Sequence, residues 1–170
     1  MTDRSANPQA TLAHPRVVAV ITALRNAGAQ HAADNIVVFT SSAPTAAAAA
    51  EKLGCPLGAI ANSLVFNAQG QPLLVMTSGA HRVDTHQVAD LLGVPALDRA
   101  DADFVREHTG QAIGGVAPVG HPHPIGTVVD TDLLAYDTIW AAAGHPHTMF
   151  PTTFDELLRL TDGTPAEVGP

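Results

Sequence analysis

The chain has 170 residues, the size of one ordinary domain, and two independent domains would be cramped in it. Its formal net charge is −8, with 16 acidic against 8 basic residues, so no overall positive field attracts nucleic acid and any RNA contact has to be local. One cysteine excludes an internal disulfide, and no apolar run has the length of a signal peptide core or a membrane span. We therefore expect a cytoplasmic protein with no membrane partner.

The N-terminal part divides into a tail and the start of a domain. Residues 1–13 are polar, contain Pro8 and lack periodicity, so they predict a flexible tail, and residues 14–170 predict one compact domain. An apolar stripe at helical spacing predicts a helix that begins at Pro15 and stops at Gly28; its members are Val17, Val18, Ile21 and Leu24.

The middle of the chain predicts a strand, a helix and a hairpin. Residues 36–39 form a short apolar run typical of a buried strand, and the alanine-rich run 46–53 predicts a helix capped by Ser42 or Thr45. Two β-prone runs, 63–66 and 72–76, are joined by five turn-forming residues, a pattern typical of a β-hairpin.

The second half predicts three helices and two strands. The helices are expected over 83–92, 102–108 and 154–160, and the strands over 126–130 and 136–142. Because helices and strands mix without strict alternation and one hairpin is antiparallel, we expect an α/β fold with a mixed sheet flanked by helices.

The most informative stretch is TGQAIGGVAPVGHPHP, residues 109–124. Glycine tolerates positive φ and close approach, so Gly110, Gly114 and Gly115 could present N–H groups to a ligand oxygen, while Pro118 stiffens the loop. The spacing matches neither a dinucleotide fingerprint nor a P-loop. The alternative is an ordinary turn without function.

Histidine pairs suggest a second chemistry. The tetrapeptide Gly-His-Pro-His occurs at 120–123 and again at 144–147. In an extended segment, residues two apart point the same way, so His121 with His123 and His145 with His147 could converge on a metal ion. The alternative is that both segments are proline-containing turns, and no cysteine or helical H-x-x-x-H supports a metal.

Other candidate groups have simple structural alternatives. Cys55 lies among apolar residues and is expected as a small core residue rather than a catalytic thiol, which needs an electropositive setting. Asp130 and Asp132 could form a paired carboxylate site, or could end a strand and cap the following turn.

Taken in order, the strand 63–66, the hairpin, the helix, the pattern T-G-x-x-I-G-G-V-x-P-x-G and the final G-x-P-H resemble the YbaK/EbsC family of aminoacyl-tRNA deacylases. These are relatives of the editing domain inserted in bacterial prolyl-tRNA synthetases. The resemblance extends over roughly residues 15–168, and its most specific portion is 109–120. Further matches lie in the helix 45–54 and at Val129-Asp130 and Pro146-His147.

The resemblance implies a compact α/β fold around a mixed, partly barrel-like sheet, acting on the ester between a wrong amino acid and the terminal adenosine of tRNA. It places the ester carbonyl on the backbone amides of a G-x-x-x-P loop, with water and the substrate's ribose hydroxyl completing hydrolysis. The loop residues would be Gly114, Gly115, Val116, Ala117 and Pro118. The substrate-binding residues would be Asn62, Ser63, Gly110, Asp130 and His147. No metal or cofactor is required.

The expected partner is the 3′ end of a mischarged aminoacyl-tRNA, delivered by an aminoacyl-tRNA synthetase or another partner, and the oligomeric state is left open. Phosphate contacts are expected from a few arginines, chiefly Arg82, Arg99 and Arg106.

One departure from the family concerns the pocket lysine, whose place is taken by Asn62. Asparagine donates a hydrogen bond but carries no charge. Three alternatives therefore stay open: a weakened or re-tuned deacylase, a silent pocket protein that binds an aminoacyl or adenosyl group, and a metal-dependent small-molecule hydrolase that uses the histidine pairs.

Overall fold

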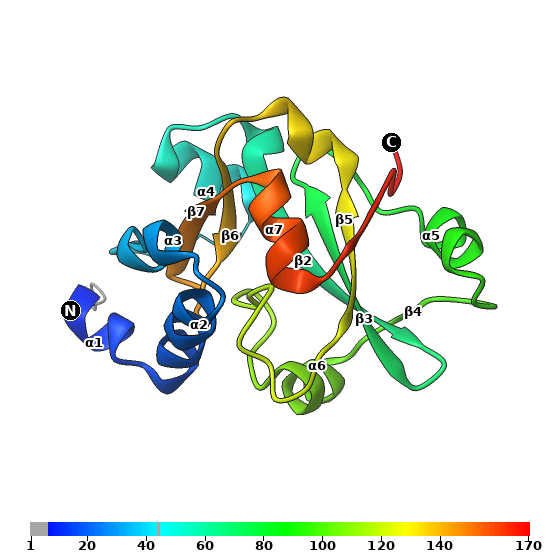
Figure 1. The fold of residues 1–170 in the computed structure, drawn as a ribbon, viewed down its shortest axis with the longest axis horizontal. Helices are drawn as coiled ribbons and strands as arrows, with labels where there is room; N and C mark the ends of the chain where they lie inside the picture. The colour runs from blue at the N-terminus through cyan, green and yellow to red at the C-terminus, as the bar shows by residue number, and fades with distance from the viewer. Residues whose placement is uncertain (1–6, 44) are drawn as a thin grey trace.

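The computed structural model describes residues 7–43 and 45–170, whose strands form one mixed sheet (Figure 1). The strand order is β1-β7-β6-β2-β3-β5-β8, and β4 pairs with the outer part of β2. The sheet contains both parallel and antiparallel pairs, so the predicted mixed α/β sheet is confirmed. The described strands form an open sheet that does not close into a barrel. The strands are β1 (Val37–Val38), β2 (Ile60–Ala68), β3 (Gln71–Ser78), β4 (Asp98–Arg99), β5 (Gly126–Asp130), β6 (Ile139–Ala142), β7 (Thr148–Thr152) and β8 (Thr164–Ala166).

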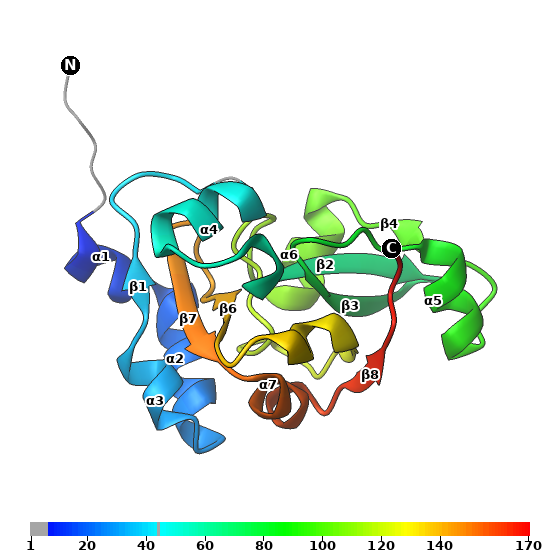
Figure 2. The same cartoon turned by 90° about the horizontal axis from the view of Figure 1, so that it is seen from above.

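Helices lie on both sides of the sheet. Figure 2 shows α4 on one side and α7 on the other, with α2 and α3 packed at the β1–β7 end. The helices are α1 (Pro8–Leu12), α2 (Pro15–Asn26), α3 (Gln30–Asp34), α4 (Ala46–Leu53), α5 (Thr85–Leu92), α6 (Ala102–Thr109) and α7 (Phe154–Thr161), with short 3₁₀ helices η1 (Leu57–Ala59) and η2 (Thr131–Ala135). Among the described residues, no helix has both the length and the apolar character that crossing a membrane requires.

Local chemistry explains where several helices begin and end. Thr45, and not Ser42, caps α4 by accepting a hydrogen bond from Ala48 N at 3.1 Å. Gly54 ends α4 with a φ of +68°, a conformation that costs glycine little. In the same way Asp101 caps α6 and Gly110 ends it.

Part of the expected tail contains a short helix. Residues 8–12 form α1, because Asn7 accepts a hydrogen bond from Gln9 N at 3.0 Å and Pro8 fits the first helical position. Residues 1–6 of the expected tail lie outside the described residues. The short elements α3, β4, β7 and β8 were not predicted from the sequence.

The edge of β2 is interrupted at one place. Its first residues, Ile60 and Ala61, pair with β6, and Phe66 and Asn67 pair with β4. In the part of the chain that the structure describes, residues 62–65 have no strand beside them on that edge. The sheet is thus continuous through β3 but opens along one side of β2.

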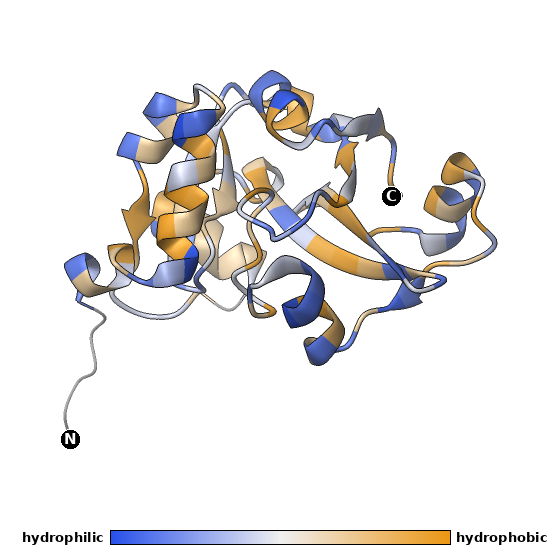
Figure 3. Cartoon of the chain, turned by 60° about the horizontal axis from the view of Figure 1, so that its bottom comes forward, coloured by the Kyte–Doolittle hydropathy of each residue, from blue (hydrophilic) through white to orange (hydrophobic). Residues whose placement is uncertain are grey.

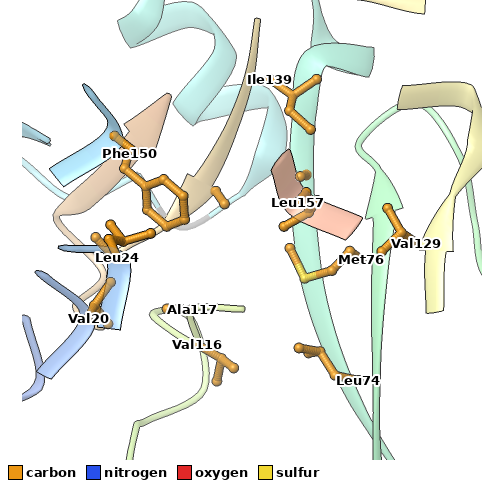
Figure 4. Close-up of a cluster of buried hydrophobic side chains, with 14 of the residues drawn as sticks. Val20, Leu24, Leu74, Met76, Val116, Ala117, Val129, Ile139, Phe150 and Leu157 are labelled. Carbon is orange, nitrogen blue, oxygen red and sulfur yellow. The ribbon is translucent and has the colours of Figure 1, made fainter. Parts of the chain in front are cut away.

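Two residues of the glycine-rich loop belong to the main hydrophobic core, which holds the loop near the interrupted edge of β2. Figure 3 shows long hydrophobic stretches along the central strands. Figure 4 shows Val116 and Ala117 between the side chains of α2, such as Val20, and those of β3, such as Leu74. Both loop residues are almost fully buried, at 4% and 0% exposure. Their burial holds the glycine-rich loop against the sheet.

Candidate functional site

A groove follows the interrupted edge of β2. A hollow of about 230 Å³ lies between α4, β2 and the β6–β7 turn, and an adjoining hollow of about 290 Å³ extends toward Arg99. The two share residues of β2 and of the glycine-rich loop; these are Ser63, Leu64, Ile113, Gly114 and Val116. We call the joined hollows the groove. The loop therefore borders both halves of one concave site.

A buried glutamine fixes the shape of the loop. Gln111 is only 1% exposed; its Oε1 accepts from Ala117 N at 2.7 Å and its Nε2 donates to the Val119 carbonyl at 3.2 Å. Its own N–H donates to Oγ1 of Thr109 at 3.0 Å. A buried amide with both ends bonded to backbone holds the loop in one conformation.

Two N–H groups of the loop stay available to a ligand. Gly115 N donates to the Ala112 carbonyl at 3.1 Å, Ala117 N donates to Gln111, and Pro118 has no N–H. Gly114 N and Val116 N have no hydrogen-bond acceptor among residues 7–43 and 45–170. Both residues line the groove. Two of the five loop residues thus combine an unpaired N–H group with a place in the groove lining.

The two central glycines are needed for different reasons. Gly114 has a φ of +95° with open space around it, so its requirement is conformational. A Cβ on Gly115 would lie 2.8 Å from the backbone carbon of His145, so its requirement is close packing. The loop and the β6–β7 turn therefore touch backbone to backbone.

Asn62 and Ser63 lie at the groove, where the sequence placed them. Asn62 is exposed, and its amide makes no hydrogen bond to another described residue. The Ser63 hydroxyl donates to the sulfur of Met76 at 3.2 Å. Asn62 is therefore the freer of the two to contact a ligand.

His147 lies beside the groove rather than in its wall. Its Nδ1 is 3.1 Å from the Phe39 carbonyl, and its neighbours Pro146 and Thr148 are wall residues. The bond to Phe39 fixes the ring next to the α4 side of the groove.

Gly110 and Asp130 depart from the expected placement. Neither lines the groove. Gly110 is the C-cap of α6, with a φ of +70°. Asp130 is fully buried and accepts from Ser78 N at 2.9 Å and Asp132 N at 3.0 Å, so it holds the end of β5 and caps η2. These contacts support the structural alternative for Asp130, in which it ends a strand and caps the following turn.

Asp130 also belongs to a histidine–carboxylate group away from the groove. Nδ1 of His81 lies 3.2 Å from Asp130 Oδ2, and Nε2 lies 2.5 Å from Asp132 Oδ2. Among the described residues, His81, Asp130 and Asp132 are the one set of three whose ligand atoms lie close enough together to hold a metal ion. The His-x-His pairs form no such group, which removes geometric support for a metal hydrolase built on them.

The remaining candidates also have local roles. Nε2 of His121 lies 2.7 Å from the Ala117 carbonyl, and burial lowers the pKa of His121, an effect that this contact partly offsets. Burial raises the pKa of the Cys55 thiol, which disfavours the reactive thiolate. The core role expected of Cys55 agrees with its contacts to the cluster around Phe39.

Sequence reasoning missed Gln111 and the residues that surround His145. Gln111 was visible as the one polar side chain between Gly110 and Gly120, and a polar residue there is a candidate for bonding its own loop. Two neighbours of His145, His14 and Arg16, come from the N-terminal end of α2, far away in the sequence, and no local pattern predicts them.

Comparison with known proteins places the chain in a family. Residues 40–160 match the aminoacyl-tRNA editing domain family. The chain belongs to this family. The predicted resemblance to YbaK-like editing domains is thereby confirmed.

Two curated relatives and one solved structure illustrate the similarity. The uncharacterized protein YwhH of Bacillus subtilis (strain 168) is 31% identical over 129 residues, which are 75% of this chain and 82% of that protein. The proline–tRNA ligase of Bacillus licheniformis is 31% identical over 144 residues, 78% of this chain but only 25% of the ligase. A proposed trans-editing enzyme for prolyl tRNA synthetase superposes with a TM-score of 0.85 and 40% identity, covering 92% of this chain and 98% of that one.

Proposed function

We propose that the protein hydrolyses the ester bond of a mischarged aminoacyl-tRNA, acting as a separate editing enzyme. One observation carries the proposal: the N–H groups of Gly114 and Val116 have no acceptor among the described residues, and both residues line the groove. Family membership supports an aminoacyl-tRNA editing role. The match to the proposed trans-editing enzyme extends over 98% of that chain, which supports the proposal that the two act in the same way.

The chemistry assigned to the loop is oxyanion stabilisation. When water attacks the ester carbonyl, negative charge develops on its oxygen, and backbone donors held in advance at that place lower the barrier. Removal of one such donor typically costs about 3 kcal/mol in the activation free energy. Gln111 and the Gly115–His145 contact hold the donors without rearrangement. A protein nucleophile is not needed, because the substrate's own ribose hydroxyl is assigned the task of assisting water.

Small side chains line the part of the groove beside α4. Ala46 and Ala49 face it from the helix, and Ala61 and Ala142 face it from the strands. We assign the amino-acid moiety, a small one, to this part. We further propose that a synthetase or other partner delivers the tRNA, and that the protein acts in the cytoplasm, where tRNA is charged.

A panel of mischarged tRNAs incubated with the purified protein tests the proposal. We expect free tRNA and amino acid to appear from at least one small-residue ester, and Gly114→Ala to slow this reaction by about tenfold or more through strain at φ +95°. Gly93→Ala is the matched control, because Gly93 also has positive φ, at +69°, and open space but lies at the end of α5. Equal rates for both variants would contradict the assignment of the loop.

A silent binding protein is the second candidate, and Asn62 is the observation that favours it. With an uncharged amide in place of the family lysine, the groove could bind an aminoacyl or adenosyl group without cleaving it. Saturable binding of adenosine, together with no hydrolysis across the whole panel, would establish this alternative.

A further inference from the structure

A group of basic side chains converges beside the groove. His14 and Arg16 come from the start of α2, and His145 and His147 from the β6–β7 turn. The rings of His14 and His145 are 5.4 Å apart, and those of His145 and His147 are 5.3 Å apart. Nη2 of Arg16 lies 3.3 Å from Nε2 of His14. We call these four residues the rim cluster.

Hydrogen bonds in the rim cluster leave donors without an acceptor. Nδ1 of His14 accepts from Arg16 N at 3.2 Å, so its Nε2 carries the hydrogen and faces a guanidinium that can only donate. Nδ1 of His145 accepts from His147 N at 3.1 Å, so its Nε2 also carries a hydrogen. Within the described chain, three neighbouring side chains therefore each hold a donor without an acceptor, and such donors suit an anionic oxygen.

The charge around the rim cluster is uncompensated. Within the described chain, no carboxylate lies within 4.0 Å of any of its four members, whereas Arg25, Arg106 and Arg159 each pair with an aspartate or glutamate. The first turn of the 12-residue α2 contains no acidic residue, so the positive end of its dipole is also unopposed. This is notable in a chain whose net charge is −8.

The environment of His145 agrees with the geometry. Burial lowers its pKa, and the positive charges of His147, His14 and Arg16 lower it further. A bound anion would favour the charged ring and raise the same pKa.

The rim cluster lies next to the proposed ester site. Pro146, between its two turn histidines, is a wall residue of the groove, and Gly115 packs on the backbone of His145. None of the four side chains forms the groove wall itself, so they suit a second group attached to the one in the groove. We propose that the rim cluster binds the phosphodiester that joins the terminal adenosine of the substrate to the preceding nucleotide. This inference rests on the proposed function.

The test compares adenosine with the dinucleotide CpA, which adds one phosphodiester and a cytidine, so the Arg16 variant below is needed to assign any gain to the phosphodiester. We expect CpA to bind at least about tenfold more tightly, the size of one charge-assisted contact, and less so at high salt. Arg16→Ala should remove most of this difference, whereas Arg25→Ala, on the same helix but paired with Asp34 at 3.5 Å, should not. His14→Asn and His145→Asn keep a side-chain acceptor for the backbone N–H two residues on while removing the ring, and should each reduce the difference. By NMR, CpA should raise the pKa of His145 and adenosine should not.

The outcomes separate this inference from the proposed function. Equal affinities for adenosine and CpA, or an unchanged ratio in Arg16→Ala, overturn the phosphodiester site even if deacylation is intact. A phosphate-dependent gain lost in Arg16→Ala supports the site even if no mischarged tRNA is hydrolysed. Inorganic phosphate that binds as tightly as CpA would show a simple anion site and overturn the assignment to a nucleic acid.

Discussion

The two Gly-His-Pro-His segments have the same sequence but different surroundings. In both, the glycine has positive φ and packs against Val20 of α2, at +83° for Gly120 and +97° for Gly144. In the first segment the ring of His121 bonds the loop's own Ala117 carbonyl, and His123 is exposed. In the second, His145 and His147 join side chains of α2 beside the groove.

The difference shows that the tetrapeptide itself determines the shape of the turn, whereas the side chains packed around it determine what its histidines contact. Glycine and proline set the backbone of both segments in similar ways. Whether a histidine bonds its own loop or becomes part of a charged cluster depends on which helix end packs beside it. A repeated motif therefore predicts shape better than function in this chain.

The largest expected effect comes from separating the glycine-rich loop from the second segment. Gly115→Val places a branched side chain against the backbone of residues 145–146, which displaces the neighbouring N–H donors. We expect deacylation to fall by about a hundredfold or more while thermal unfolding stays cooperative. Gly126→Val, at the open start of β5, is the control that should keep its activity. Full activity in Gly115→Val would show that the loop is not the reacting centre.

The stability of the two turns should differ as their glycine contacts differ. A Cβ on Gly144 would lie 2.7 Å from the Arg16 carbonyl oxygen, whereas one on Gly120 would be 3.1 Å from a side-chain carbon of Val20. Both alanine variants carry the strain of positive φ. We expect Gly144→Ala to lower the free energy of unfolding by about 2–4 kcal/mol and Gly120→Ala by about 1–2 kcal/mol. Urea denaturation of both variants measures the difference, and the opposite order would contradict this account of the packing.

The sequence predicted much of the fold because most of its elements are locally determined. The helices α2, α4, α6 and α7 carry their apolar stripe and caps in their own residues, and the hairpin β2–β3 carries its own turn. The strands β7 and β8 depend on pairing partners elsewhere in the chain, and β7 contains a proline. Local pattern could not identify them.

The site was predicted in part for the same reason. The loop and Asn62 stand out in sequence because glycine, proline and one family departure mark them. The use of each N–H could not be read from sequence, since Gln111 takes the Ala117 donor through a side-chain contact. The rim cluster joins residues about 130 positions apart, which only tertiary packing brings together.

Replacing Asn62 by lysine, the residue that the family has at this position, tests the β2 side of the groove. Asn62 is exposed at the groove that Pro146 of the second segment also lines, so a lysine there would keep its hydration and lose little by burial. We expect Asn62→Lys to raise hydrolysis of at least one mischarged tRNA by about tenfold, the effect of one charge-assisted contact. Gln71→Lys, exposed at the start of β3, controls for net charge. A lower rate in Asn62→Lys would mean that the groove is tuned around asparagine.

The smallest effect is expected from removing metal ions. In each Gly-His-Pro-His segment, ring nitrogens are already engaged by backbone: His121 at the Ala117 carbonyl, His145 at His147 N, and His147 at the Phe39 carbonyl. A ring with one nitrogen so fixed can still ligate through the other, but three ligand atoms do not gather at either segment in the described chain. Treatment with a chelator should therefore leave the deacylation rate unchanged, as followed by release of amino acid. Stoichiometric zinc in the purified protein, with activity lost on its removal and restored on its return, would instead give the histidine pairs a catalytic role.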